Sequence, residues 1–192
     1  EDKVKAYRNW LGLMTRQLSC EVAKGDGVIT RALRAPRVWS SPDDRGQVTL
    51  PGNALLLARN VGMHMHTDAV VKADGSPIPE HFLDAMVTAA CALHDVRGAR
   101  ANSRVGSIYI VKPKMHGAAE VQLACDLFAA VERTLDLPRN TLKMGVMDEE
   151  RRTSVNLASA IAPARDRIGF VNTGFLDRTA DEIHPSMLAG PI

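Results

Sequence analysis

From about residue 55 onward, short apolar runs alternate with longer stretches of helical periodicity. The apolar runs cover residues 55–58, 107–111, 142–146 and 168–171. Each has the length of a buried strand, and strands that are apolar on both faces are typical of a parallel sheet covered by helices. Four βα units therefore follow one another, which predicts an α/β fold.

The intervening stretches predict three helices. The first begins at about Pro79, and its expected buried face is Phe82, Met86, Ala89, Ala90 and Leu93. The second follows the strand at 107–111 and ends before Pro138, with Val121, Ala124, Leu127, Phe128, Val131 and Leu135 on one stripe. The third begins near Thr153 or Ser154. Apolar residues at three- and four-residue spacing support each of the first two.

Two architectures share this alternation, an open doubly wound sheet and a (β/α)8 barrel. Both place functional residues at the carboxyl ends of the strands. Four units are half a barrel, and a complete barrel needs at least about 200 residues. The chain has 192 residues and begins at Glu1 without a methionine. We therefore expect it to be an excerpt of a longer protein.

Residues 17–54 differ from the rest of the chain. Turn residues at 25–27 and 41–46 flank short strand-like runs at 28–30 and 48–50, which indicates an inserted, β-containing segment. Before it, apolar residues from Val4 to Leu18 recur at helical spacing.

Composition excludes several classes of partner. The 24 basic and 22 acidic residues are interspersed and leave a formal charge of +2, so we expect no nucleic-acid or anionic-membrane partner. The apolar runs are far shorter than the roughly 18 residues of a membrane span, and the N-terminus is no signal peptide. A cytoplasmic location is expected. Three widely spaced cysteines, Cys20, Cys91 and Cys125, are expected to be reduced core thiols.

Charged residues gather just past the predicted strands. Arg59 and Asn60 follow the first, Lys112 to Gly117 the second, Asp148 to Glu150 the third, and Asn172 to Asp177 the fourth. Carboxylates on neighbouring strand ends suit a hard, oxygen-preferring ion such as Mg²⁺. Alternatively, Asp148 and Glu150 only begin a helix, where acidic groups are favourable.

Three further features allow two interpretations each. Arg59 can bind an anionic substrate or pair structurally with a carboxylate. Gly174 can bring the backbone close to a ligand or form an ordinary turn. His64 and His66 can hold a transition metal, as in a zinc hydrolase, or lie in a surface loop.

The strand-end residues belong to longer strings that closely resemble the malate synthase G family. They are KMGVMDEERRTS at 143–154, NTGFLDRT at 172–179, DEIH at 181–184, YRNWLGLM at 7–14, RNVG at 59–62 and IYIVKPKMHG at 108–117. The string GMHMHT at 62–67 departs from the usual Gly-His-Leu-Met-Thr of that family.

The resemblance implies part of a (β/α)8 TIM barrel interrupted by an inserted α/β domain. Residues 1–16 and 55–192 would belong to the barrel, and residues 17–54 to the end of the insertion. The full-length enzyme, several times longer and monomeric, makes malate from glyoxylate and acetyl-CoA with Mg²⁺ in the glyoxylate cycle.

By the same resemblance, Glu149 and Asp177 are the metal ligands and Arg59 is the catalytic arginine. Glyoxylate would contact these three and Gly174, Phe175 and Leu176, and Arg31 would contact acetyl-CoA. A base removes a methyl proton from acetyl-CoA, the enolate attacks the glyoxylate aldehyde, and hydrolysis releases malate. Mg²⁺ polarises the aldehyde, and Arg59 stabilises charge on the enolate oxygen.

The family's catalytic aspartate has no counterpart in this chain, so we expect the 192-residue polypeptide alone to be inactive. Two other functions remain open besides the zinc hydrolase. One is a lyase or hydrolase acting on malyl- or citramalyl-thioesters with the same residues. The other is a non-catalytic remnant that keeps the ligand-facing side chains.

Overall fold

A computed structural model describes residues 2–43 and 45–191 and contains the expected parallel sheet, in the strand order β10–β9–β8–β5. The strands are β5 (Ala58–Arg59), β8 (Ile108–Lys112), β9 (Leu142–Asp148) and β10 (Ile168–Thr173). The last three lie close to their predicted positions, and only the first prediction is wrong, because β5 begins three residues late. The Asn102 side chain hydrogen-bonds both the amide and the carbonyl of Leu56, at 2.7 and 3.1 Å, and so takes the place of a neighbouring strand.

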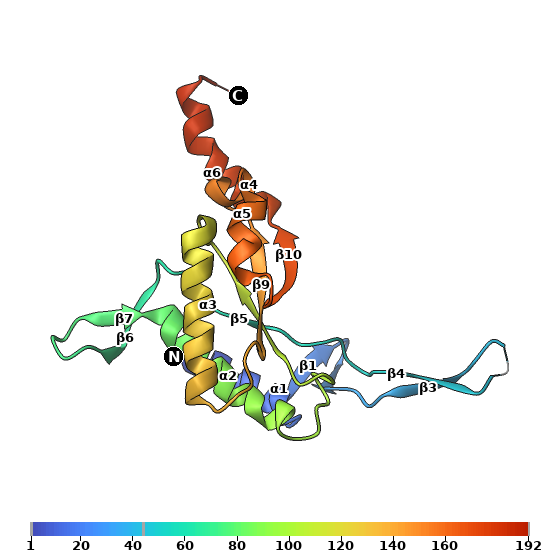
Figure 1. The fold of residues 1–192 in the computed structure, drawn as a ribbon. Coiled ribbons are helices and arrows are strands. Elements are labelled where there is room, and N and C mark those ends of the chain that lie inside the picture. Colours follow the sequence, from blue (N-terminus) through green and yellow to red (C-terminus); the bar gives the residue numbers. More distant parts are fainter. Residues whose placement is uncertain (1, 44, 192) are drawn as a thin grey trace.

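Helices follow the strands and cover one face of the sheet (Figure 1). They are α2 (Glu80–Val96), α3 (Gly117–Thr134), α4 (Arg151–Ser154), α5 (Leu157–Ile161) and a 3-10 turn (Ala162–Ala164). Helix α6 (Phe175–Leu188) follows β10 but has no buried residue and extends away from the sheet (Figure 1). Along β8, Ile108 and Ile110 are buried beneath the helices, whereas Tyr109 and Val111 on the other face are half-buried. One covered and one uncovered face is the arrangement expected of part of a barrel wall.

The core lies between the sheet and helices α2 and α3. In α3 the predicted stripe is confirmed, since Val121, Ala124, Phe128 and Val131 are all buried. In α2 the predicted face is only partly right, because Ala89 is buried and Met86 and Leu93 pack against the core, whereas the centre of the buried face is shifted. Phe82 is 39% exposed, and the buried residues are His81, Asp84, Ala85, Thr88, Ala89, Ala92, Asp95 and Val96.

The error in α2 has a physical cause. Asp84 and Asp95 each accept backbone N–H groups from neighbouring loops, and hydrogen bonds of this kind offset the cost of burying a carboxylate. Hydropathy alone assigns such residues to the solvent side.

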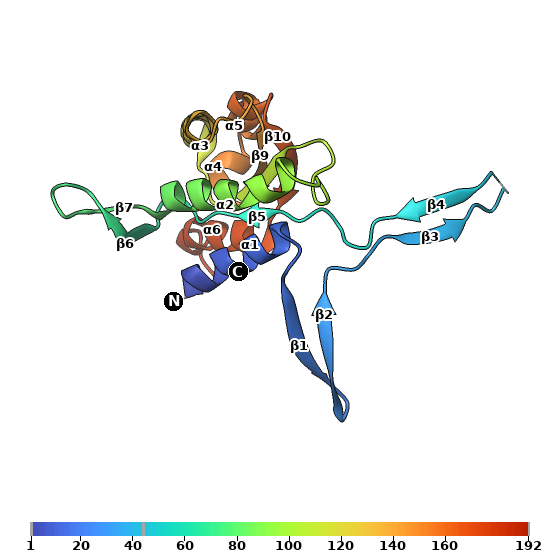
Figure 2. The same cartoon turned by 90° about the horizontal axis from the view of Figure 1, so that it is seen from below.

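Three antiparallel hairpins project from this core (Figures 1 and 2). They pair β1 (Ser19–Lys24) with β2 (Gly27–Ala32), β3 (Arg37–Ser40) with β4 (Gln47–Leu50), and β6 (His66–Val71) with β7 (Pro77–Pro79). The strands at 28–30 and 48–50 are confirmed within β2 and β4. The sequence did not predict their partners, nor the β6–β7 pair on either side of the expected loop.

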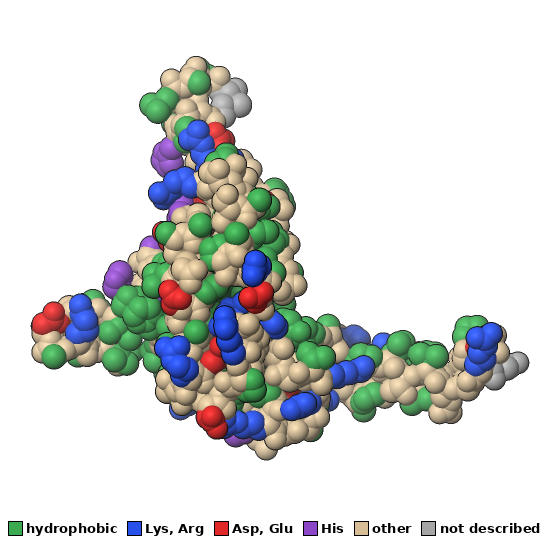
Figure 3. All heavy atoms as spheres, in the orientation of Figure 1, with side chains coloured by type: hydrophobic (Ala, Val, Ile, Leu, Met, Phe, Trp, Pro, Cys, Tyr) green, Lys and Arg blue, Asp and Glu red, His purple; other side chains and the backbone are tan. Residues whose placement is uncertain are grey.

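Helix α1 (Asp2–Met14) lies beside α2, as Figure 2 shows. The three cysteines are free thiols, but Cys20 is exposed on β1 and therefore is no core thiol. Basic and acidic side chains are interspersed over the face drawn in Figure 3. In the described part of the chain, no helix is both long and apolar enough to cross a membrane.

Candidate active site

Two carboxylates meet where β9 and β10 end. Glu149 directly follows β9, and Asp177 lies in the first turn of α6, which follows β10. Parallel strands present their carboxyl ends at one edge of the sheet, so side chains 28 residues apart in the sequence become neighbours. The two groups lie close enough for each to shift the pKa of the other.

The two carboxylates occupy different surroundings. Glu149 is 2% exposed and accepts the backbone N–H of Lys114 at 2.9 Å, and its burial raises the pKa of its carboxyl group. Asp177 is much more exposed. Lys114, whose Nζ lies 3.1 Å from Asp177 Oδ2, lowers the pKa of Asp177, with smaller contributions from Glu149 and Arg59. The pair can therefore hold one shared proton or a cation.

Lys114 is the site residue to which the sequence assigned no role. Its ammonium lies between Asp177 and Glu150, whose Oε1 is 3.5 Å away, and His116 Nε2 lies 3.5 Å from Glu150 Oε2. The sequence did contain a signal for this role, because Lys114 follows a predicted strand and the acids Asp148 to Glu150 follow the next one. Glu150 is thus already paired with the Lys114 ammonium.

Asp148 also has a structural partner, since it accepts a hydrogen bond from the Ser154 hydroxyl of α4. Of the three consecutive acids, Glu149 is the one that turns toward Asp177.

Gly174 leaves room for Glu149. A Cβ built on Gly174 would lie 2.9 Å from Glu149 Oε2 and 3.0 Å from Glu149 Cβ, which is closer than packed side chains approach. Gly174 is also the N-cap of α6. The amides of Phe175 and Leu176 lie in the first turn of that helix, and both residues are 71% exposed. Such amides favour anions.

Arg59 ends β5 on the uncovered side of the sheet and is exposed. It lines a hollow of about 340 Å³ together with His64 and Lys114. Its positive charge acts on Asp177 across the site. The structure therefore brings Arg59, Glu149, Gly174 and Asp177 to one edge.

Two candidate residues lie elsewhere. Arg31 is exposed on β2, where it pairs with Cys20 in the hairpin that projects from the sheet (Figure 2). His66 begins β6 and pairs with Pro79, whereas His64 lies over Gly62 beside the hollow. Arg31 as a coenzyme contact stays a prediction.

The Glu149–Asp177 pair suits a hard divalent cation. Two carboxylates converge, one is buried, and Gly174 keeps the space beside them free of a side chain. Within residues 2–43 and 45–191, no group of three or more His, Cys, Asp or Glu side chains could hold a metal ion. The described residues would thus supply two ligands, as is common for Mg²⁺, which keeps several waters.

The fold and this edge define a class of protein: βα units of a barrel that carry their charged residues at the carboxyl ends of the strands. Comparison with family models then makes the assignment. Residues 55–191 match the model described as malate synthase, TIM barrel domain, and the chain belongs to the malate synthase family.

Curated relatives of this chain support the same family assignment. The chain is 54% identical over 192 residues to a malate synthase G of Corynebacterium efficiens, 49% over 194 residues to one of Halalkalibacterium halodurans, and 50% over 192 residues to one of Corynebacterium glutamicum. These alignments cover 99 to 100% of this chain and 25 to 26% of the relatives. The chain therefore spans about a quarter of the length of the relatives it matches.

Proposed function

We propose that this chain carries the metal- and glyoxylate-binding part of a malate synthase, which condenses acetyl-CoA with glyoxylate and hydrolyses the product to malate and CoA. The observation that carries the proposal is the convergence of Glu149 and Asp177, opposite Arg59, at one edge of a malate synthase barrel segment.

Each residue has a role that follows from its chemistry. Glu149 and Asp177 would hold Mg²⁺, which when bound supplies a Lewis acid for the glyoxylate aldehyde. The α6 amides at Phe175 and Leu176 would bind the glyoxylate carboxylate. Arg59 would stabilise the negative charge that develops on the enolate oxygen of acetyl-CoA. Arg31 is proposed as a coenzyme contact, carried on the β1–β2 hairpin.

The test is calorimetric titration of Mg²⁺ and glyoxylate into the protein as its source expresses it. We expect Glu149→Ala and Asp177→Ala to abolish Mg²⁺-dependent glyoxylate binding. Asp166→Asn, which removes one negative charge before β10 at the opposite end of the sheet, is the matched control and should bind normally. Unchanged binding in both site variants would show that these two carboxylates do not hold the cation and would favour a non-catalytic remnant.

Activity separates the proposal from a thioester lyase or hydrolase. CoA release is measured with acetyl-CoA plus glyoxylate, and in parallel with malyl- and citramalyl-thioesters. We expect the first reaction to be the faster one. The isolated 192-residue polypeptide should form no malate, because the family's base has no counterpart in this sequence.

A further inference from the structure

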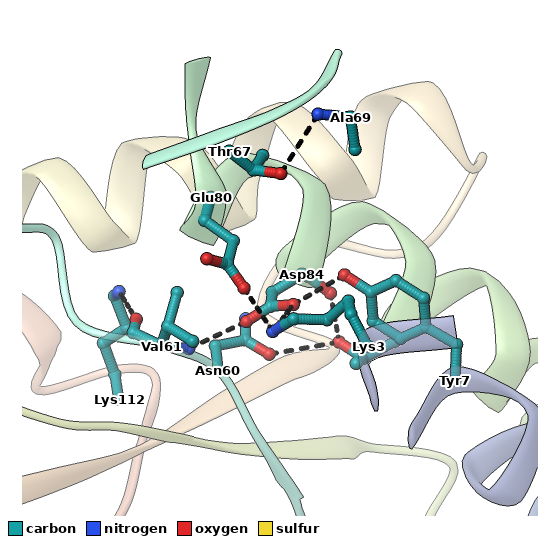
Figure 4. A network of polar contacts seen from close by, with 10 residues as sticks. Lys3, Tyr7, Asn60, Val61, Thr67, Ala69, Glu80, Asp84 and Lys112 are labelled. Atoms are coloured by element: carbon teal, nitrogen blue, oxygen red, sulfur yellow. Dashed lines mark hydrogen bonds and ion pairs between the residues drawn. The ribbon is translucent and has the colours of Figure 1, made fainter. Parts of the chain in front are cut away.

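The loop that follows Arg59 is held on both sides of one residue. The backbone N–H of Val61 donates to Asp84 Oδ2 at 2.8 Å, and the Lys112 ammonium donates to the Val61 carbonyl at 2.6 Å (Figure 4). Asp84 comes from α2 and Lys112 from the end of β8. Helix α2 and strand β8 therefore both hydrogen-bond the backbone of Val61, two residues beyond Arg59.

Asp84 is itself held in place by α1. The Tyr7 hydroxyl donates to Asp84 Oδ1 at 2.6 Å, and the Lys3 ammonium donates to the same oxygen at 2.9 Å. Lys3 also lies 2.6 Å from Glu80 Oε1. Asp84 is 1% exposed, so both of its oxygens are committed to partners in a nearly dry environment, where such bonds are strong and directional.

Lys112 is buried to the same degree, at 0% exposure. Burial is the main cause that lowers the pKa of its ammonium, to about 8, while the nearby carboxylates of Asp84 and Glu120 act the other way. Burying a lysine without a close carboxylate partner is costly. Its ammonium donates a hydrogen bond to the Val61 carbonyl.

We propose that Asp84 and Lys112 are positioning residues that fix where Arg59 stands relative to the Glu149–Asp177 pair. The proposal rests on the function proposed above, because it concerns the geometry of that reaction. Arg59 is exposed and lies at the very end of a two-residue strand, so β-pairing alone gives it little restraint. A misplacement of about 1 Å in an active site can reduce the rate about 100-fold.

The experiment compares two buried aspartates of the same helix. Asp95, 4% exposed, accepts the backbone N–H groups of Asn102 and Ser103 at 2.8 and 2.9 Å. Asp95 thus hydrogen-bonds the backbone of the loop before β8, just as Asp84 hydrogen-bonds the backbone of the loop after β5. Asp84→Asn and Asp95→Asn remove the same charge from similar surroundings, but only the first faces the loop that carries Arg59.

In the protein as its source expresses it, we expect Asp84→Asn to lower kcat by about ten- to a hundredfold, with KM for glyoxylate changed less than about threefold. Asp95→Asn should keep kcat within twofold. Lys112→Met removes the hydrogen bond to the Val61 carbonyl, leaves Asp84 intact and should lower kcat in the same way. This variant replaces Asp84→Asn in the test if Asp84→Asn does not fold. Hydrogen exchange at the Val61 amide should speed up in Asp84→Asn and stay unchanged in Asp95→Asn.

The proposal is overturned if kcat of Asp84→Asn stays within twofold of wild type, or if Asp95→Asn loses as much. If the wild-type protein forms no malate, the proposed function has failed instead. In that case the hydrogen-exchange measurement still tests whether Asp84 restrains the loop. A Val61 amide that is equally protected in Asp84→Asn and in wild type would show that it does not.

Discussion

At the scale of single residues, the site depends on a difference between two carboxylates. Glu149 is enclosed and Asp177 is open to solvent beside Lys114, and the pKa values of the two groups move in opposite directions as a result. Residues without a charge are part of the same arrangement, since Gly174 leaves the space that the Glu149 side chain occupies.

Gly174→Ala is predicted to weaken the cation site without unfolding the protein. The added methyl group would meet Glu149 Oε2 at 2.9 Å and push the carboxylate from its place. The backbone of Gly174, at φ −92°, is one that alanine adopts easily, so the free energy of unfolding should fall by only about 1–2 kcal/mol, the usual cost of alanine at an N-cap. Displacing a ligand in this way commonly costs about 10- to 100-fold in metal affinity.

Isothermal titration with Mg²⁺ in the presence of glyoxylate measures this effect. Gly27→Ala is the control, because a Cβ there finds its nearest neighbour 3.9 Å away. Equal Mg²⁺ affinity in Gly174→Ala and wild type would show that Glu149 does not bind the cation from this position.

At the scale of elements, α2 does more than cover the sheet. Its buried face carries Asp84 and Asp95, which hold loops at opposite ends of the sheet, and also His81, which is 1% exposed. Burial is the largest cause that lowers the pKa of His81 to about 4, and the positive charge of Lys112 acts in the same direction. His81 is therefore neutral in the folded protein near pH 7.

This burial makes stability sensitive to acid. The unfolded chain binds a proton at His81 near the ordinary pKa of 6.5, whereas the folded chain does so only near pH 4. Stability is thus fully present above pH 6.5 and falls as the pH drops from 6.5 to 4, by at most about 3 kcal/mol. Denaturant unfolding at several pH values should show this loss in wild type and a smaller one in His81→Phe. His94→Phe, an exposed substitution on the same helix, should keep the wild-type slope.

At the scale of the whole molecule, the sheet has two open edges, at β5 and at β10. Large apolar side chains lie exposed near the second edge and on α6, among them Val171, Phe175, Leu176 and Leu188. Unpaired strand edges beside apolar surface favour association with other chains.

The 192-residue polypeptide on its own is accordingly predicted to self-associate at micromolar concentration. Sedimentation velocity should show species larger than 20.8 kDa, and Val171→Lys on β10 should reduce their amount, because a charge on an edge strand opposes pairing. Val28→Lys, on the projecting β1–β2 hairpin, is the control. A monodisperse monomer at high concentration would show that the open edges are harmless.

Much of this protein could be read from its sequence because the relevant signals are local. Strands β8, β9 and β10 and the buried stripe of α3 follow from periodicity, and the strand-end position of Arg59, Glu149 and Asp177 follows from their place after apolar runs. The polar face of α2 could not be read in this way. Whether Asp84 is buried depends on Tyr7, Lys3 and Val61, which lie 77, 81 and 23 residues away in the sequence.

The sequence by itself determined the class of fold, the family and the list of charged residues at the strand ends, because each depends on short-range pattern or on contiguous strings. Only the tertiary structure decided which of those residues meet. Glu149 lies beside Asp177, and Lys114 lies between Asp177 and Glu150. Arg31 lies on a hairpin that projects from the sheet. Asp84 and Lys112 hydrogen-bond the loop that follows Arg59. The reason is that contact between distant residues is set by strand order and packing, which act on the whole chain at once.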